Sequence, residues 1–257
     1  MKIAALTMFY NEAFIAPFFL KHYEYLDEIL VLYETDTDDG TKDILLSQSN
    51  VTIRDCHIQG GIDDTAKVSM INDAIRTINA DWVYVLDSDE FIFPMGHENP
   101  YDFLARQNDY SLVLAAMYQV YRHRTDKDLD PTKPPVPQRV HGDPDITSTV
   151  QSENRDCNSH YIKPIVVRPD AGIQFLPGNH VAQGDIRMSP EFYTGSHFQM
   201  ADPELAIARR MQRKARISTA NKMRMMGFQH WNVTEAWIRA ECERHLDDPV
   251  IPDLCKS

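Results

Sequence analysis

Three carboxylates, Asp87, Asp89 and Glu90, stand within four positions of one another. They follow residues 82–86, an unbroken run of β-branched, aromatic and aliphatic residues that is typical of a strand buried on both faces of a parallel sheet. Open α/β sheets bind ligands where such strands end. Carboxylates this close repel one another unless a positive charge lies between them, and a divalent cation bound to a phosphate supplies one. An acidic turn that only caps the strand is the alternative interpretation.

The elements around this segment alternate between strand and helix patterns. Strands are expected at residues 2–8, 28–33 and 51–55, and a second acidic turn, residues 34–41, follows the second of them. A helix after Asn11 and Glu12 is expected to begin nearer Ala16, because Pro17 fits a first helical turn. Residues 63–79 have apolar side chains along one helical face. This alternation predicts an α/β fold with a parallel or mostly parallel sheet and right-handed crossovers.

The second half of the chain has a different pattern. Strands are expected at residues 111–121 and 161–168, separated by a Pro-rich polar segment, residues 125–160, that is either a lid over a site or a simple connection. His180 and His197 fall at two later predicted turns. Asp202 begins a helix, and residues 232–246 form a last amphipathic one.

That helix after Asp202 carries a basic stretch in an otherwise acidic protein. The preferred interpretation is a solvated helix face, and the alternative is that one or two of the cations meet a pyrophosphate or an acidic acceptor. The stretch consists of Arg209, Arg210, Arg213, Lys214 and Arg216.

Composition limits the kinds of partner. The 257 residues are 43% hydrophobic and 25% charged, which fits one large α/β domain or a domain with an appended lobe. The net charge of −12 disfavours nucleic acid as a partner. The opening residues do not resemble a signal peptide, and no apolar run approaches the ~20 residues of a membrane span. We therefore expect a cytoplasmic protein without a transmembrane segment, whose four cysteines are reduced.

An ordered set of motifs resembles the family 2 glycosyltransferases, in particular their branch with an Asp-x-Asp-Glu-Phe signature, which is also similar to family 92. The resemblance covers roughly residues 3–216. It differs from the family in Glu34, where an Asp is usual, and in Phe198, where a Tyr is usual. The motifs are Tyr10-Asn11-Glu12-Ala13, His22-Tyr23, the turn from Asp36 to Thr41, Asp81-Trp82, Leu86-Asp87-Ser88-Asp89-Glu90-Phe91, Lys163-Pro164-Ile165-Val166-Val167-Arg168-Pro169, His180 and His197-Phe198.

This resemblance implies the GT-A fold and transfer of a hexose from a UDP- or GDP-sugar, with Mn²⁺ or Mg²⁺, to a glycan or lipid-linked acceptor in polysaccharide biosynthesis. It implies that Asp89 binds the metal, with His197 completing the shell and Asp87 assisting or holding the ribose. It implies a domain at residues 1–200, with a nucleotide-binding half at 1–91 and an acceptor half at 92–200, and C-terminal helices at 201–257 packed on it. The implied nucleotide pocket contains Thr7, Tyr10, Asn11, Glu12, Glu34, Asp36 and Asp87.

The chemistry of these residues agrees with that activity. A cation held by Asp89 stabilises a departing nucleoside diphosphate, and hard oxygen ligands with one imidazole suit Mn²⁺ or Mg²⁺. An inverting enzyme also needs a carboxylate base, for which Asp143, Asp145, Asp185 and Glu191 are candidates in loops.

Two other functions stay open. A phosphatase of the haloacid dehalogenase type also has Asp-x-Asp after a buried strand, but there the motif follows the first strand, and Phe91 stands where Thr or Val is usual. A catalytically inactive GT-A domain that binds a glycan or a protein partner is the non-enzymatic alternative.

Overall fold

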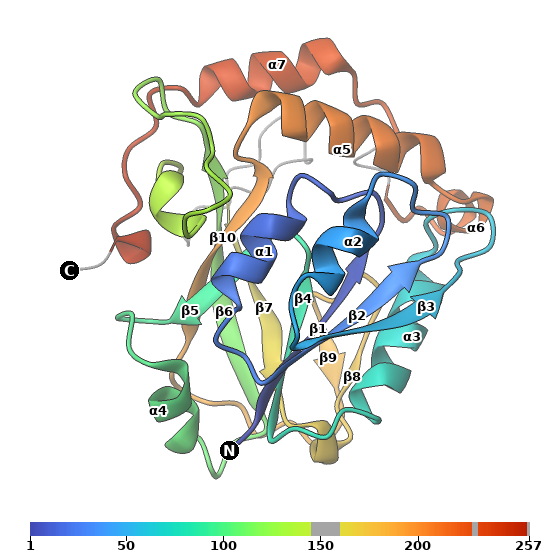
Figure 1. The fold of residues 1–257 in the computed structure, drawn as a ribbon, viewed down its shortest axis with the longest axis vertical. Helices are drawn as coiled ribbons and strands as arrows, with labels where there is room; N and C mark the ends of the chain where they lie inside the picture. Colours follow the sequence, from blue (N-terminus) through green and yellow to red (C-terminus); the bar gives the residue numbers. More distant parts are fainter. Residues whose placement is uncertain (145–159, 228–230, 256–257) are drawn as a thin grey trace.

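The computed structural model describes residues 1–144, 160–227 and 231–255, and its centre is an eight-stranded sheet in the order β3-β2-β1-β4-β7-β6-β10-β5 (Figure 1). A separate pair, β8 and β9, forms a small antiparallel sheet. The strands are β1 Ile3–Phe9, β2 Glu28–Glu34, β3 Val51–Cys56, β4 Trp82–Asp87, β5 Glu90–Pro94, β6 Leu112–Tyr121, β7 His160–Val167, β8 Gln174–Phe175, β9 Ala182–Gln183 and β10 Tyr193–Met200.

Seven α-helices flank the sheet within the described residues. They are α1 Ala16–His22, α2 Thr41–Leu46, α3 Asp64–Ile75, α4 Pro100–Ala105, α5 Pro203–Arg216, α6 Thr219–Met223 and α7 Glu235–Arg244. Among the strand pairs of the central sheet, β1–β2, β1–β4, β2–β3 and β6–β10 are parallel, whereas β4–β7, β6–β7 and β5–β10 are antiparallel. The predicted α/β class, with a mostly parallel sheet, flanking helices and a C-terminal helical segment, is confirmed.

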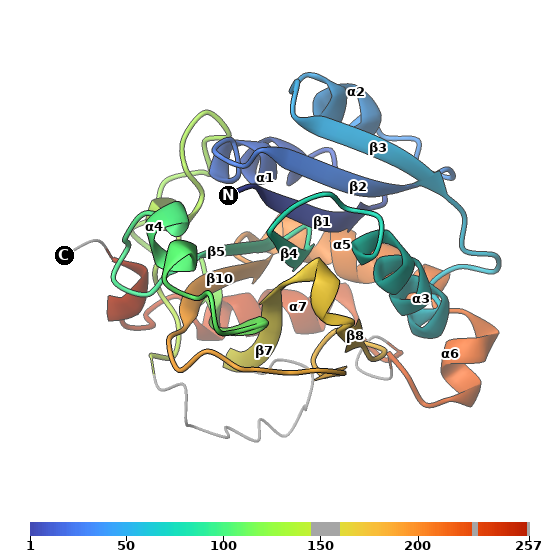
Figure 2. The ribbon, with the colours of Figure 1, turned by 90° about the horizontal axis from the view of Figure 1, so that it is seen from below.

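Each face of the sheet has its own hydrophobic core. Alternate residues of β4 enter the two cores: Trp82 and Tyr84 pack toward α1, α2 and α4, whereas Val83 and Val85 pack toward α3 and β8. These helices lie on opposite faces of the sheet (Figures 1 and 2). Burial on both faces explains why β4 has no polar alternation and is apolar or aromatic at every position before Asp87.

Five strands end at one common edge. In the register of the parallel pairs, Met8 lies opposite Asp87 and Phe9 lies opposite Tyr33. Strand β7 is antiparallel to both β4 and β6, so β6 and its parallel neighbour β10 run in the direction of β4. The carboxyl ends of β1, β2, β4, β6 and β10 therefore share this edge, and α5 and α7 lie across it in Figure 1.

Helix α1 begins at Ala16 with Pro17 in its first turn, as the sequence indicated. Other element boundaries differ from the predictions. His197 lies inside β10 and not at a turn, because residues 193–200 pair with β6 and β5. Residues after Asp89 form the unpredicted edge strand β5. Of the predicted loop 125–160, residues 145–159 lie outside the described residues, and its lid role stays a prediction.

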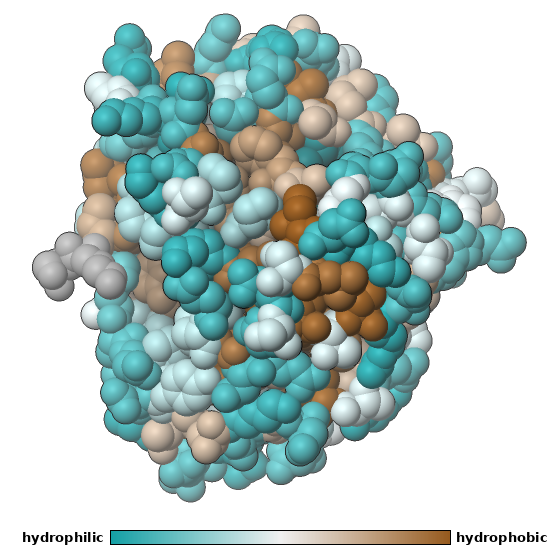
Figure 3. Space-filling model, in the orientation of Figure 1, coloured by the Kyte–Doolittle hydropathy of each residue, from teal (hydrophilic) through white to brown (hydrophobic). Residues whose placement is uncertain are grey.

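The division of the chain at residue 200 also stays a prediction. Helix α5 begins three residues after β10, and its Leu205 and Ala206 belong to core clusters shared with the sheet. None of the described helices combines the length and apolar character that a bilayer span requires. The face of the molecule in Figure 3 is mainly hydrophilic, with an apolar patch near α2, whose Leu46 is exposed.

Gly195 permits the close packing that places the end of β10 at the site edge. A Cβ at this position would lie 2.7 Å from the Phe91 carbonyl oxygen and 2.9 Å from Met117 Sδ. We expect Gly195→Ala to lower the free energy of unfolding by about 2–3 kcal/mol through overpacking. Urea denaturation measures this, with Thr52→Ala in the exposed part of β3 as control. Equal unfolding midpoints for the two variants would contradict the packing argument.

Candidate functional site

A buried guanidinium connects two of the predicted site carboxylates. Arg209 of α5 donates to Glu12 Oε1 from Nε at 3.1 Å and from Nη2 at 2.8 Å, and Nη1 donates to Asp89 Oδ2. Nη2 also donates to the Ser88 hydroxyl at 3.2 Å. The side chains of Arg209 and Asp89 are 4% and 0% exposed, so this contact is closed to solvent. Helix α5, which crosses the strand ends, thus supplies the cation that pairs with Asp89 just after β4.

The other two acids of the motif have lysine partners. Lys67 of α3 donates to Asp87 Oδ1 at 2.7 Å, and Lys163 of β7 donates to both oxygens of Glu90 at 2.7 and 2.8 Å. Glu90 Oε2 in turn accepts the backbone N–H of Asp87 at 2.9 Å. The Lys163–Glu90 pair is fully buried, whereas the Lys67 and Asp87 side chains are 28% and 31% exposed. A ligand therefore reaches this group of charges from the side of Lys67 and Asp87.

His197 joins Asp89 from the neighbouring strand end. Its Nε2 lies 3.2 Å from Asp89 Oδ2. Two ligand atoms about 2.1–2.2 Å from one octahedral ion are separated by about 3 Å, so this spacing suits a shared divalent cation. Asp89 Oδ1 is buried and lacks a hydrogen-bond partner among the described residues.

The residues present thus fit a cation in part. Asp89 and His197 have suitable spacing, although Arg209 contacts the same carboxylate oxygen. Asp87 is turned to Lys67, and its predicted role as a metal ligand stays a prediction.

A fourth cation, again from α5, covers the ends of β1 and β2. The guanidinium of Arg216 lies over the Tyr10 ring, 3.2 Å from its centroid, and pairs with Glu34. The last turn of α5 is fixed in this place because the Arg216 carbonyl accepts the Ile62 N–H at 2.7 Å. Gly61 makes the approach possible: a Cβ there would lie 2.1 Å from that carbonyl oxygen. Tyr10 and Glu34 are therefore brought together as predicted, with an arginine between them.

These pairings shift the pKa values of the acids in opposite directions. Desolvation works to raise the pKa of Asp89, but Arg209 and His197 outweigh it and hold that pKa well below its usual range. Lys67 likewise outweighs desolvation and lowers the pKa of Asp87. Burial raises the pKa of Glu12, which Arg209 and Arg213 offset only in part, and that of Glu34, which Arg216 offsets only in part. The surroundings thus favour the ionised form of Asp87 and Asp89 and disfavour that of Glu12 and Glu34.

The remaining predicted nucleotide-pocket residues lie around the end of β1. Asn11 has φ +47° and exchanges two 2.8 Å hydrogen bonds with Asp38, which tie the β1–α1 loop to the β2–α2 loop. Asp36 is exposed at the rim, with His57 at 3.5 Å. Thr7 is buried within β1, and its hydroxyl has no hydrogen-bond partner among the described residues. Their roles toward a nucleotide stay predictions.

The predicted catalytic bases are not assembled beside Asp89. Glu191 binds Arg106 and precedes β10, at the end opposite His197. The Asp185 carbonyl accepts the hydroxyl of Ser111, which precedes β6 at that same far edge. Asp145 lies outside the described residues. A base that acts beside Asp89 therefore does not come from Asp185 or Glu191 as the structure places them.

The basic stretch of α5 was interpreted mainly as a solvated face, and for part of it this was wrong. Arg209 and Arg210 are buried, and Arg216 is 17% exposed in its pair with Glu34. The available signal was the spacing of Arg209, Arg213 and Arg216, at i, i+4 and i+7, which places them on one helical face. Lys67 and Lys163 carried no such signal, because each lies singly in its own element.

His180 lies at the margin of the site. Partial desolvation lowers the pKa of its ring, and the ammonium of Lys163 acts in the same direction. The charges of Asp87 and Glu90 act on the pKa of this exposed side chain in the opposite direction. At neutral pH the ring is uncharged and able to accept a proton.

Solved structures with similar folds include Staphylococcus aureus TarS 1–349, with 14% identity and a TM-score of 0.40 over 96% of this chain and 69% of that one. The same TarS segment in complex with UDP-GlcNAc matches with 13% identity and a TM-score of 0.39 over 96% and 72%. Glucosyl-3-phosphoglycerate synthase from Mycobacterium tuberculosis, in complex with Mn²⁺, UDP and phosphoglyceric acid, matches with 14% identity and a TM-score of 0.31 over 46% and 43%.

No protein-family model and no curated protein sequence matches the chain. A likeness at these TM-scores does not define a function, so the function is argued below from the side chains of the site.

Arg209→Ala would leave Asp89 and Glu12 buried without their cation. We expect it to lower the free energy of unfolding by about 3–5 kcal/mol at pH 7. Loss of the arginine raises the pKa of both carboxyl groups in the folded state, so protonation then favours folding and the deficit should shrink as the pH falls toward 5.

Urea denaturation at several pH values measures both effects. Arg239→Ala, which removes a half-exposed arginine paired with Glu204, is the matched control and should change little. A deficit for Arg209→Ala that is small, or that grows as the pH falls, would show that the buried pairing is described wrongly.

Proposed function

We propose that this protein transfers a sugar from a nucleotide-diphosphate sugar to a hydroxyl group of a glycan or lipid-linked acceptor. The observation that carries the proposal is the set of charges at the common edge of the sheet. Asp89 and His197 meet there, and Asp87 lies nearby in its pair with the partly exposed Lys67. This edge includes the switch point between β1 and β4, where α/β sheets bind nucleotides.

Asp89 and His197 would hold the Mn²⁺ or Mg²⁺ ion of such an enzyme. When bound, the ion would stabilise the negative charge of the leaving diphosphate. Arg209 keeps Asp89 ionised and fixes its carboxylate from the protein side. Lys67 is placed to contact a phosphate, because its ammonium is partly exposed and lies beside the ionised Asp87.

The nucleoside would lie at the ends of β1 and β2. Tyr10 offers an aromatic face and Glu34 a carboxylate, and Arg216 now fills the space between them. Donor binding therefore involves Arg216 directly: its guanidinium either becomes part of the wall against the base or moves away from Tyr10. The acceptor class and a cytoplasmic location are proposed from the sequence alone.

His180 is our proposal for the general base. The sequence argument sought a carboxylate, but neither Asp185 nor Glu191 lies at this edge. An uncharged imidazole can take the proton of an acceptor hydroxyl as the new glycosidic bond forms. His180 is such a group, and the charges of Asp87 and Glu90 act on it.

Thermal denaturation with UDP, GDP, CDP or dTDP, with and without Mn²⁺, tests donor binding. One nucleotide should stabilise the protein in the presence of Mn²⁺: at 100 times its dissociation constant the gain is about 2.7 kcal/mol, or a rise in Tm of about 5 °C or more.

Asp89→Asn should abolish the metal-dependent part of this rise, whereas Asp102→Asn, in the remote helix α4, should not. No response to any of the four nucleotides would count against the proposal. Release of phosphate from small phosphoesters would favour the phosphatase alternative, and glycan binding that survives Asp89→Asn would favour an inactive domain.

The pH dependence of transfer tests His180. Because the neutral ring is the active form and its pKa is lowered, the acid limb of kcat/KM should lie below pH 6.5. His180→Gln should lower kcat by about 10²-fold or more and remove this limb, while the nucleotide-induced rise in Tm is kept. An unchanged pH profile in the variant would assign the base to another residue.

A further inference from the structure

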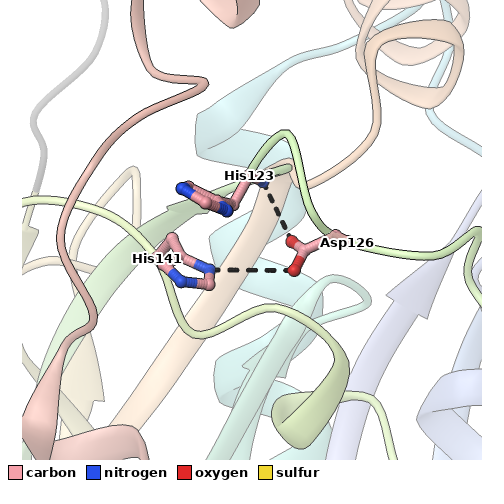
Figure 4. A group of neighbouring side chains, drawn as sticks. All are labelled: His123, Asp126 and His141. Atoms are coloured by element: carbon pink, nitrogen blue, oxygen red, sulfur yellow. Dashed lines mark hydrogen bonds and ion pairs between the residues drawn. The ribbon is translucent and has the colours of Figure 1, made fainter.

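Three metal-ligating side chains converge outside the proposed donor site. His123 follows β6, Asp126 lies in the next turn, and His141 lies at the end of the loop that returns to β6 (Figure 4). One potential ligand atom from each lies within 4.8 Å of the other two. In the part of the chain that the structure describes, no other set of three His, Cys, Asp or Glu residues meets this condition.

The backbone fixes two of the three ligands. Asp126 Oδ2 accepts the backbone N–H of His123 at 2.9 Å, which orients the carboxylate toward both rings. The backbone of His141 forms antiparallel β-bridges with Tyr121 and with Val250 of the C-terminal segment. The His141 carbonyl accepts the Tyr121 N–H at 3.0 Å. Ligands held in this way are preorganised for an ion.

The hydrogen bonding of His141 is incomplete. Its Nδ1 is buried and lacks a hydrogen-bond partner among the described residues. It faces Asp126 Oδ1 at 3.8 Å, which is too long for a hydrogen bond. Two ligand atoms on a tetrahedral ion at about 2.0–2.1 Å are separated by about 3.3 Å, so a shift of about half an ångström would bring this pair to a metal-binding distance.

His123 supplies the adjustable ligand. Its ring is stacked on that of His141, with centroids 4.3 Å apart, and its Nδ1 lies 2.7 Å from the exposed Thr125 hydroxyl. Its ring is partly exposed.

Arg139 is a positively charged side chain close to the site. Arg139 Nη1 lies 3.8 Å from Asp126 Oδ2, but its guanidinium is already bound by the carbonyl oxygens of Ala201, Lys127 and Gln138. It therefore does not replace a cation between Asp126 and the histidines.

We propose that His123, Asp126 and His141 bind a divalent transition-metal ion of the zinc class. Two imidazoles and one carboxylate suit Zn²⁺ better than Mg²⁺ or Ca²⁺, which prefer oxygen ligands alone. Three protein ligands leave at least one position for water or another ligand. The ion would join the end of β6 to the returning loop and, through the His141–Val250 bridge, to the C-terminal segment.

This site is independent of the proposed transfer reaction. It lies at the end of β6, next to β10 in the sheet, and it shares no residue with the proposed donor site. Two of its three ligands are imidazole nitrogens, whereas the proposed donor site combines two aspartates with one imidazole.

Zinc binding by the full-length protein tests the proposal. After treatment with a chelator, the Asp89→Asn variant, in which the other candidate metal site is removed, is titrated with Zn²⁺ alone by calorimetry. We expect one Zn²⁺ per chain, a higher Tm with Zn²⁺, and no comparable effect of Mg²⁺. Adding His123→Ala or His141→Ala should weaken binding at least tenfold.

His57→Ala, which removes an exposed histidine elsewhere, is the matched control and should bind Zn²⁺ unchanged. Circular dichroism confirms that each variant is folded, and His123→Ala provides the test if His141→Ala is not. The absence of stoichiometric zinc binding, or equal affinity in the His123→Ala and His57→Ala variants, would overturn the proposal.

Discussion

The contact between Arg209 and the buried acids Asp89 and Glu12 is the interaction on which the rest of the site depends. Two carboxylates taken out of water are tolerated only with a cation between them, and breaking such a pairing costs more than its presence contributes. Arg209 therefore fixes the position of α5: the helix lies across the strand ends where the guanidinium contacts both acids. The position of Arg216 over Tyr10 follows from the same placement of α5.

The same principle explains how so many carboxylates occupy one edge of the sheet. Each strand or loop that delivers an acid has a partner element that delivers a cation: α3 gives Lys67 to Asp87, β7 gives Lys163 to Glu90, and α5 gives Arg216 to Glu34. Only the first of these pairs has substantial access to water. The Lys67–Asp87 pair is therefore the place where an anionic ligand can replace Asp87 as the partner of Lys67.

Much of this architecture could be predicted from the sequence, for a physical reason. Strands buried on both faces, such as β4, have continuous apolar runs, and the acids that follow them lie at the carboxyl edge by topology alone. The pairing of Asp89 with Arg209 could not be predicted, because it joins residues 120 positions apart and depends on where α5 packs. The position of Asp185 and Glu191 could not be predicted for the same reason: loop sequences do not reveal at which edge of the sheet they lie, and the role of these residues as bases stays a prediction.

Helix α5 also has a consequence for the order in which the protein assembles. On the ribosome, Glu12 and Asp89, in the segments that follow β1 and β4, emerge long before Arg209, which lies 197 and 120 residues further along the chain. Domains generally fold as units during synthesis. Until α5 has been synthesised, Glu12 and Asp89 have no Arg209 to pair with, so we expect this acidic edge to stay hydrated and to close only when α5 docks.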